Sequence, residues 1–121
     1  MLPTGLKRAA LLLAPWLALG GCSSAAQQDR QNAQKARSLL AEWALLSESH
    51  QAGRLTDIYY AQMRGEAEKQ LTALAEGAPQ SGSAAALAIA EIAQVHGEPP
   101  VSLLRRRADL AEAVENGLEA H

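Results

Sequence analysis

Residues 36–46, with the sequence ARSLLAEWALL, carry the pattern that decides the fold class. Their apolar side chains recur at steps of three and four residues, which places them on one face of an α-helix. The positions on this face are Ala36, Leu39, Leu40, Trp43 and Leu46. We therefore expect an amphipathic helix over about residues 28–51, with His50 in its last turn and Gly53 ending it in the left-handed conformation.

Three more helices are expected after residue 55. Thr56, Ser83 and Ser102 are candidate N-caps for the second, third and fourth helix. Gly77 ends the second helix, and the Ala-rich third helix is expected to run to about His96. The apolar positions that we expect these helices to bury are Ile58, Tyr59, Met63, Ala67, Leu71 and Leu74, then Leu87, Ile89, Ile92 and Val95, then Leu103, Leu110, Val114 and Leu118. Short connections favour antiparallel neighbours, so the predicted fold is all-α, a small antiparallel bundle of three to four short helices over residues 29–121.

The composition limits the chain to one small domain. It has 121 residues, of which 48% are apolar, and a single Cys, so no internal disulfide can form. The formal charge is −2 for the whole chain and becomes −4 from residue 22 onward, because Lys7 and Arg8 precede that point and all 13 acidic residues follow it. A negatively charged body repels nucleic-acid phosphates, so no nucleic-acid partner is expected.

The N-terminal segment has the three-part layout of a secretory signal. Lys7-Arg8 is followed by the apolar run AALLLAPWLAL at residues 9–19 and then by Gly20-Gly21-Cys22. An 11-residue run covers about half of the hydrocarbon core of a membrane, so no stable membrane-spanning helix is expected. The alternative reading makes Cys22 an ordinary thiol beside an apolar N-terminal helix.

The tetrapeptide Leu19-Gly20-Gly21-Cys22 resembles the lipobox of bacterial lipoproteins. The resemblance covers only the signal segment. It implies cleavage before Cys22, fatty acyl chains such as palmitate on that residue, and a membrane as partner through this covalent lipid. Residues 1–21 would then be the signal peptide, and residues 22–28 a short polar tether. Since Ser23 follows the cysteine where aspartate typically retains such proteins in the inner membrane, the resemblance implies the outer membrane, facing the periplasm.

No arrangement typical of catalysis or metal binding is recognised. The three histidines His50, His96 and His121 lie near helix ends or at the chain terminus, and no His-x-x-x-His or Gly-x-Ser-x-Gly motif occurs. We therefore predict no enzymatic activity, no metal site and no cofactor besides the covalent lipid on Cys22.

Two groups of residues are candidate contact surfaces. Arg105, Arg106 and Arg107 precede the acidic residues of the fourth helix, an order that opposes the helix dipole. An acidic partner, an anionic headgroup or peptidoglycan would compensate for this. In the alternative interpretation, these arginines are solvated or pair within the molecule with Glu76, Glu91 or Glu98.

The second candidate surface consists of Trp43, Tyr59 and Tyr60. Adjacent tyrosines on a helix point about 100° apart, so one face does not bury both, and one of them is a candidate exposed anchor. The alternative is that Trp43 packs against Tyr59 in the core.

These observations lead to a functional hypothesis. Only 18 Leu, Ile and Val residues follow residue 21, so the domain is expected to gain stability from self-association or from an envelope protein partner, unless close packing of alanines makes the monomer stable alone. The predicted function is that of a non-catalytic, lipid-anchored accessory or scaffold protein acting through protein-protein contacts. The alternative is a regulatory lipoprotein that modulates an envelope sensor kinase, because the composition is similar to that of short helical lipoproteins associated with such kinases.

Overall fold

The computed structural model describes the backbone of residues 2–119 and the side chains of residues 25–118. Within these residues the chain forms four α-helices and one 3-10 turn, and no strand. The elements are α1 (Leu2–Gln51), α2 (Asp57–Gly77), η1 (Ala78–Ser81), α3 (Ala84–Ile92) and α4 (Val101–Glu119). The predicted all-α helical bundle is thus confirmed.

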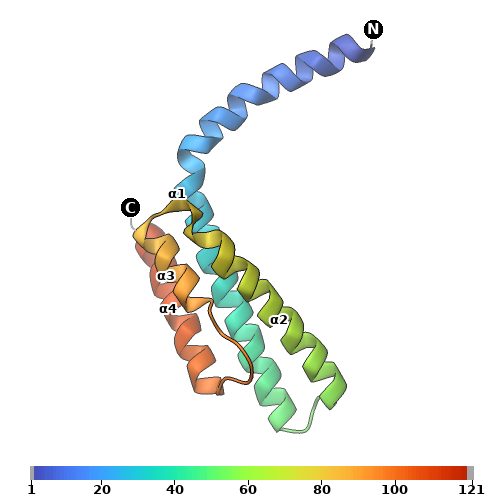
Figure 1. Cartoon of the computed structure of the whole chain (residues 1–121), viewed down its shortest axis with the longest axis vertical. Coiled ribbons are helices and arrows are strands. Elements are labelled where there is room, and N and C mark those ends of the chain that lie inside the picture. Colours follow the sequence, from blue (N-terminus) through green and yellow to red (C-terminus); the bar gives the residue numbers. More distant parts are fainter. Residues whose placement is uncertain (1, 120–121) are drawn as a thin grey trace.

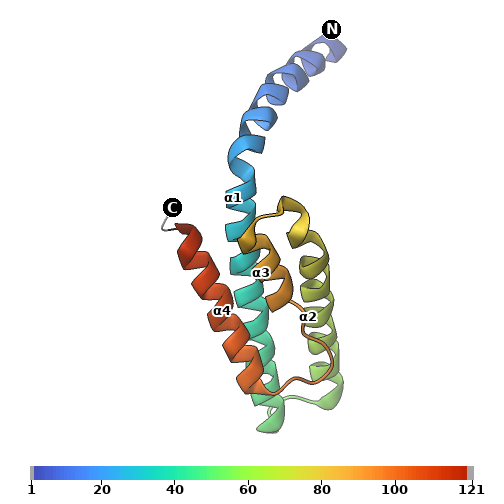
Figure 2. The same cartoon turned by 60° about the vertical axis from the view of Figure 1, so that its left-hand side comes forward.

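The helices run alternately down and up around α1 (Figures 1 and 2). α1 contacts α2 on one side and α4 on the other, while the short α3 contacts all three longer helices. The first half of α1 extends beyond the bundle as a single curved helix (Figure 1). The turn at residues 52–56 lies at the opposite end of the bundle, where α4 also begins.

α1 is longer than the sequence pattern predicts. It is continuous from Leu2 to Gln51, so residues 22–28, expected as a tether, are helical. No new helix begins at residues 19–22. Cleavage before Cys22 stays a prediction. The side chain of Cys22 lies outside the described residues.

Local signals located most helix ends correctly. Thr56 Oγ1 accepts from the N–H of Tyr59, and Ser83 Oγ accepts from the N–H of Ala86, so both predicted N-caps are confirmed. Gly53 adopts a φ of 75°, as the predicted C-cap requires. The predicted cap at Ser102 is wrong: α4 begins one residue earlier, and the N–H groups of its first turn bond to the Pro100 carbonyl instead.

α3 also ends earlier than expected, at Ile92 and not near His96. A helix end leaves carbonyl oxygens without intrahelical partners. Here Arg107 of α4 takes two of them, since its Nη1 donates to the carbonyl oxygens of Glu91 (2.8 Å) and Ile92 (3.3 Å). This side chain compensates for the hydrogen bonds that a longer helix would have made.

The core is built largely from small side chains. Half of the buried apolar residues are alanines, and the largest fully buried side chains are Trp43, Leu40, Leu71, Ile89 and Leu104. Alanines allow neighbouring helix axes to approach closely, which compensates for the small number of large apolar residues.

Several buried positions differ from the prediction. Ile58, Tyr59, Leu87 and Leu110 are all substantially exposed, at 76%, 47%, 56% and 48%. In α4, the buried residues include Leu104, Ala108 and Ala111, whereas Leu110 had been expected in the core. The reason is the close contact of α4 with α1, which small side chains permit and which rotates Leu110 to the outside.

Candidate functional site

A groove of about 540 Å³ lies on the outside of the bundle between α3 and α4. Its lining is mostly apolar, with one acidic and one basic residue. The residues that line it are Ala88, Glu91 and Ile92 from α3 and Arg107, Leu110, Ala113 and Val114 from α4. Leu104 and Ala108 of α4 face the core. Leu110 therefore lies half exposed beside α3, where it lines the groove.

The charged residues of the groove occupy opposite walls. The Arg107 guanidinium is held against the end of α3 by the carbonyl oxygens of Glu91 and Ile92. Glu91 is exposed, and its carboxylate forms no ion pair with any residue that the structure describes. The groove therefore has an acidic wall on α3 and a basic wall on α4.

The structure separates the three arginines that were predicted to act together. Arg105 donates from Nε (3.0 Å) and from Nη2 to Oε1 of Glu48 in α1, Arg106 is exposed, and Arg107 faces α3. The carboxylates that were expected as partners do not take part: within the described residues, no ion pair joins these arginines to Glu76, Glu91 or Glu98. The helical twist explains the separation, because successive residues point about 100° apart.

The three aromatic residues are also separated. Trp43 is fully buried and Tyr60 is 7% exposed, whereas Tyr59 is 47% exposed. The expectation that Tyr59 belongs to the core is therefore wrong, and Tyr60 takes that place. Of the three, only Tyr59 presents a substantial surface for contact.

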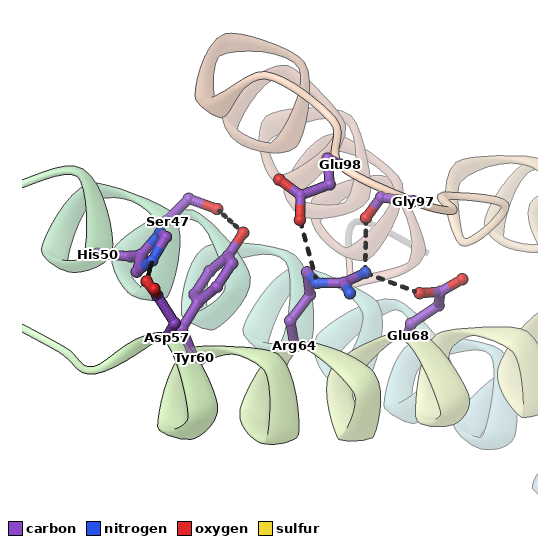
Figure 3. Close-up of polar contacts among 8 residues, drawn as sticks. All are labelled: Ser47, His50, Asp57, Tyr60, Arg64, Glu68, Gly97 and Glu98. Atoms are coloured by element: carbon purple, nitrogen blue, oxygen red, sulfur yellow. Dashed lines mark hydrogen bonds and ion pairs between the residues drawn. The ribbon is translucent and has the colours of Figure 1, made fainter.

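Two polar clusters join helices at the end of the bundle that carries the turn at residues 52–56 (Figure 3). In the first, His50 Nε2 lies 2.7 Å from Asp57 Oδ1. The His50 ring stacks on Tyr60, with ring centroids 4.1 Å apart. The Tyr60 hydroxyl contacts Ser47 Oγ at 3.3 Å. Because Ser47 bonds to the tyrosine, these residues do not form a serine–histidine–aspartate relay.

The second cluster is centred on Arg64 of α2 (Figure 3). Its Nη1 donates to the Gly97 carbonyl at 2.9 Å and lies 3.5 Å from a carboxylate oxygen of Glu68, while its Nε lies 3.7 Å from Glu98. These contacts hold the loop between α3 and α4 against α2. Both clusters connect elements of the fold (Figure 3).

A third polar cluster lies at the other end of the bundle and has no local sequence signal. Asp29 is 4% exposed, and its carboxylate accepts hydrogen bonds from Ser81 Oγ (3.0 Å) and Ser83 Oγ (2.7 Å). Asp29 precedes the two serines by 52 and 54 positions in the sequence, so only the fold brings it to them.

Within the described part of the chain, no group of three or more His, Cys, Asp or Glu side chains could hold a metal ion, and no helix is both long and apolar enough to cross a membrane. Comparisons with models of known protein families, with curated proteins and with solved structures give no match.

Proposed function

We propose that this chain is a small, non-catalytic lipoprotein of the bacterial cell envelope, anchored to the outer membrane through Cys22 and acting through protein-protein contacts. The observation that carries the proposal is the sequence Leu19-Gly20-Gly21-Cys22 directly after an apolar run, on the helix that also forms the core of the bundle.

The position of Cys22 on α1 supports a bundle that stands directly on the membrane. Asp29, the first buried residue of the described side chains, follows Cys22 by seven residues, or about 10 Å along a helix axis. The anchor would therefore lie close to η1 and the start of α3, which Asp29 contacts through Ser81 and Ser83.

The same geometry separates the arginines from the anchor. Arg105 pairs with Glu48, which follows Cys22 by 26 residues, or about 39 Å along the axis of α1. That separation favours a protein or peptidoglycan neighbour over headgroups of the anchoring membrane as the contact of Arg105 and its neighbours.

The polar side chains support a role in contact and not in catalysis. The clusters around Asp29, Tyr60 and Arg64 each join two or more elements of the fold. The groove between α3 and α4, whose lining is mostly apolar, is a surface that could serve such contacts.

The experiment compares the parent chain with the variant Cys22→Ser in a Gram-negative host, using mass spectrometry of the purified protein and membrane fractionation. We expect the parent to begin at Cys22, to carry acyl chains there and to fractionate with the outer membrane. Cys22→Ser should retain residues 1–21 and carry no lipid.

Ser23→Asp provides a matched control, because it leaves the lipidation site intact. We expect Ser23→Asp to remain lipidated and to move to the inner membrane. A parent chain that keeps its first residues, carries no lipid and is extracted without detergent would contradict the proposal.

A further inference from the structure

The groove between α3 and α4 is an exposed and mostly apolar surface. Leu110 on one wall is 48% exposed, and Leu87, which precedes Ala88 of the other wall in the sequence, is 56% exposed. Ala88 and Ala113 also line the groove and are small enough to allow close approach. Large exposed apolar side chains around small ones are typical of a contact surface.

The charges of the groove lie at one height along the bundle. Arg107 Nη1 is 2.8 Å from the carbonyl oxygen of Glu91, so these two residues are level on their antiparallel helices. Arg107 interacts there with neutral carbonyl groups, and no carboxylate of the described residues neutralises its charge. The groove thus presents a negative and a positive charge side by side at the same level.

We propose that this groove binds a second copy of the chain, with the two bundles parallel. In a two-fold symmetric dimer the same surface is used by both copies. If the two-fold axis runs along the bundles, α3 of each copy faces α4 of the other at the same height. Glu91 of each copy then lies opposite Arg107 of the other, so both charge contacts are attractive.

The antiparallel alternative brings like charges together. If the two-fold axis runs across the bundles, α3 faces α3 and α4 faces α4. If that axis lies at the level of these two residues, Glu91 faces Glu91 of the second copy and Arg107 faces Arg107. Like charges placed opposite each other at an interface are unfavourable, so the charge pattern favours the parallel dimer.

The parallel orientation also fits two anchors in one membrane, and in this respect it rests on the proposed function. Both copies would carry Cys22 at the same end and hold their grooves at the same height above the lipid. Confinement to a membrane raises the effective concentration of the two copies, which favours their association.

The test is cysteine crosslinking of the full chain in intact cells, with a bifunctional maleimide long enough to join neighbouring helices. Ala113→Cys places a thiol on the groove, and the matched control Ala61→Cys places one on the exposed side of α2. We expect a crosslinked dimer of this chain with Ala113→Cys and little with Ala61→Cys. Equal crosslinking of both variants, no dimer, or an adduct with a different protein in place of the dimer would overturn the proposal.

The parent chain separates this proposal from the proposed lipid anchor. An acylated Cys22 does not react with maleimide, so crosslinking of the parent chain would show that the anchor is absent. The difference between Ala113→Cys and Ala61→Cys still reports on the groove in that event.

A charge variant tests the orientation. Glu91→Lys, combined with Ala113→Cys, should lower the crosslinked fraction about fivefold, because it replaces the attraction to Arg107 of the second copy by repulsion. Glu91 is exposed and lies near the end of α3, where a lysine suits the helix dipole, so the fold should tolerate the change. Glu76→Lys makes the same charge change on α2 and should leave the crosslinked fraction unaltered. Unaltered crosslinking with Glu91→Lys would overturn the parallel arrangement.

Discussion

At the end of the bundle nearest Cys22, a buried carboxylate joins α1 to the start of α3. At the opposite end, an exposed histidine–carboxylate contact joins α1 to α2, and an exposed ion pair joins α1 to α4. Asp29 is 4% exposed and accepts from two serine hydroxyls. At the other end, the side chain of Asp57 is 96% exposed in its contact with His50, and Arg105 and Glu48 are 49% and 44% exposed. The contacts are similar in length but differ in their access to water.

This difference determines how much each contact contributes to stability. A hydrogen bond to a buried charged group is costly to lose, because no water replaces it. An exposed ion pair competes with water and salt, and contributes little. We therefore expect the end near the proposed anchor to be the more rigid of the two.

The largest effect is expected from Ser83→Ala. Ser83 Oγ donates to Asp29 and also caps α3 by accepting from the N–H of Ala86. Losing the cap and leaving the buried carboxylate with one donor should lower the free energy of unfolding by about 2–3 kcal/mol. Urea unfolding of the full chain in detergent, followed by circular dichroism, measures this change.

Ser38→Ala is the matched control, because Ser38 is exposed on α1. Its effect should stay within about 0.5 kcal/mol. If both variants unfold at the same urea concentration, the Asp29 cluster does not stabilise its end of the bundle.

The Asp29 cluster also shows the limit of prediction from the sequence. Thr56 and Ser83 were located as caps, because each bonds to an N–H three residues away. Asp29 has no such local signal, since its partners lie 52 and 54 residues away. The two helix starts marked by these caps were thus predictable from neighbouring residues, whereas contacts between helices were not.

The same reasoning applies to the groove. The pattern of large apolar residues in α4 predicted that Leu110 faces the core, but close packing against α1 favours Ala108 and Ala111 there. The three arginines were recognisable as a group, yet their division among α1, solvent and α3 depends on how α4 is rotated. No local pattern specifies that rotation when alanines and leucines compete for the core.

A smaller effect is expected from Tyr60→Phe at the end far from Cys22. This change removes the hydroxyl that contacts Ser47 but keeps the ring that stacks on His50. Since Ser47 is buried and would lose its partner, the free energy of unfolding should fall by about 1 kcal/mol. Tyr59→Phe, at the exposed neighbouring position, should change it far less. A larger loss with Tyr59→Phe than with Tyr60→Phe would contradict the assignment of Tyr60 to the core.

The smallest effect is expected from Asp57→Asn, which removes the charge facing His50 and a negative charge in the first turn of α2. The contact is exposed, so the free energy of unfolding should fall by no more than about 0.5 kcal/mol in dilute buffer. Salt at 1 M shortens the screening length to about 3 Å and should abolish even this difference between the parent and Asp57→Asn.

Ser83→Ala provides the contrast under the same conditions, because its effect depends on a buried carboxylate, and salt screens buried charges much less than exposed ones. Its loss of stability should persist in high salt. If salt abolishes the effects of both variants equally, the two ends of the bundle do not differ in the way that their exposure implies.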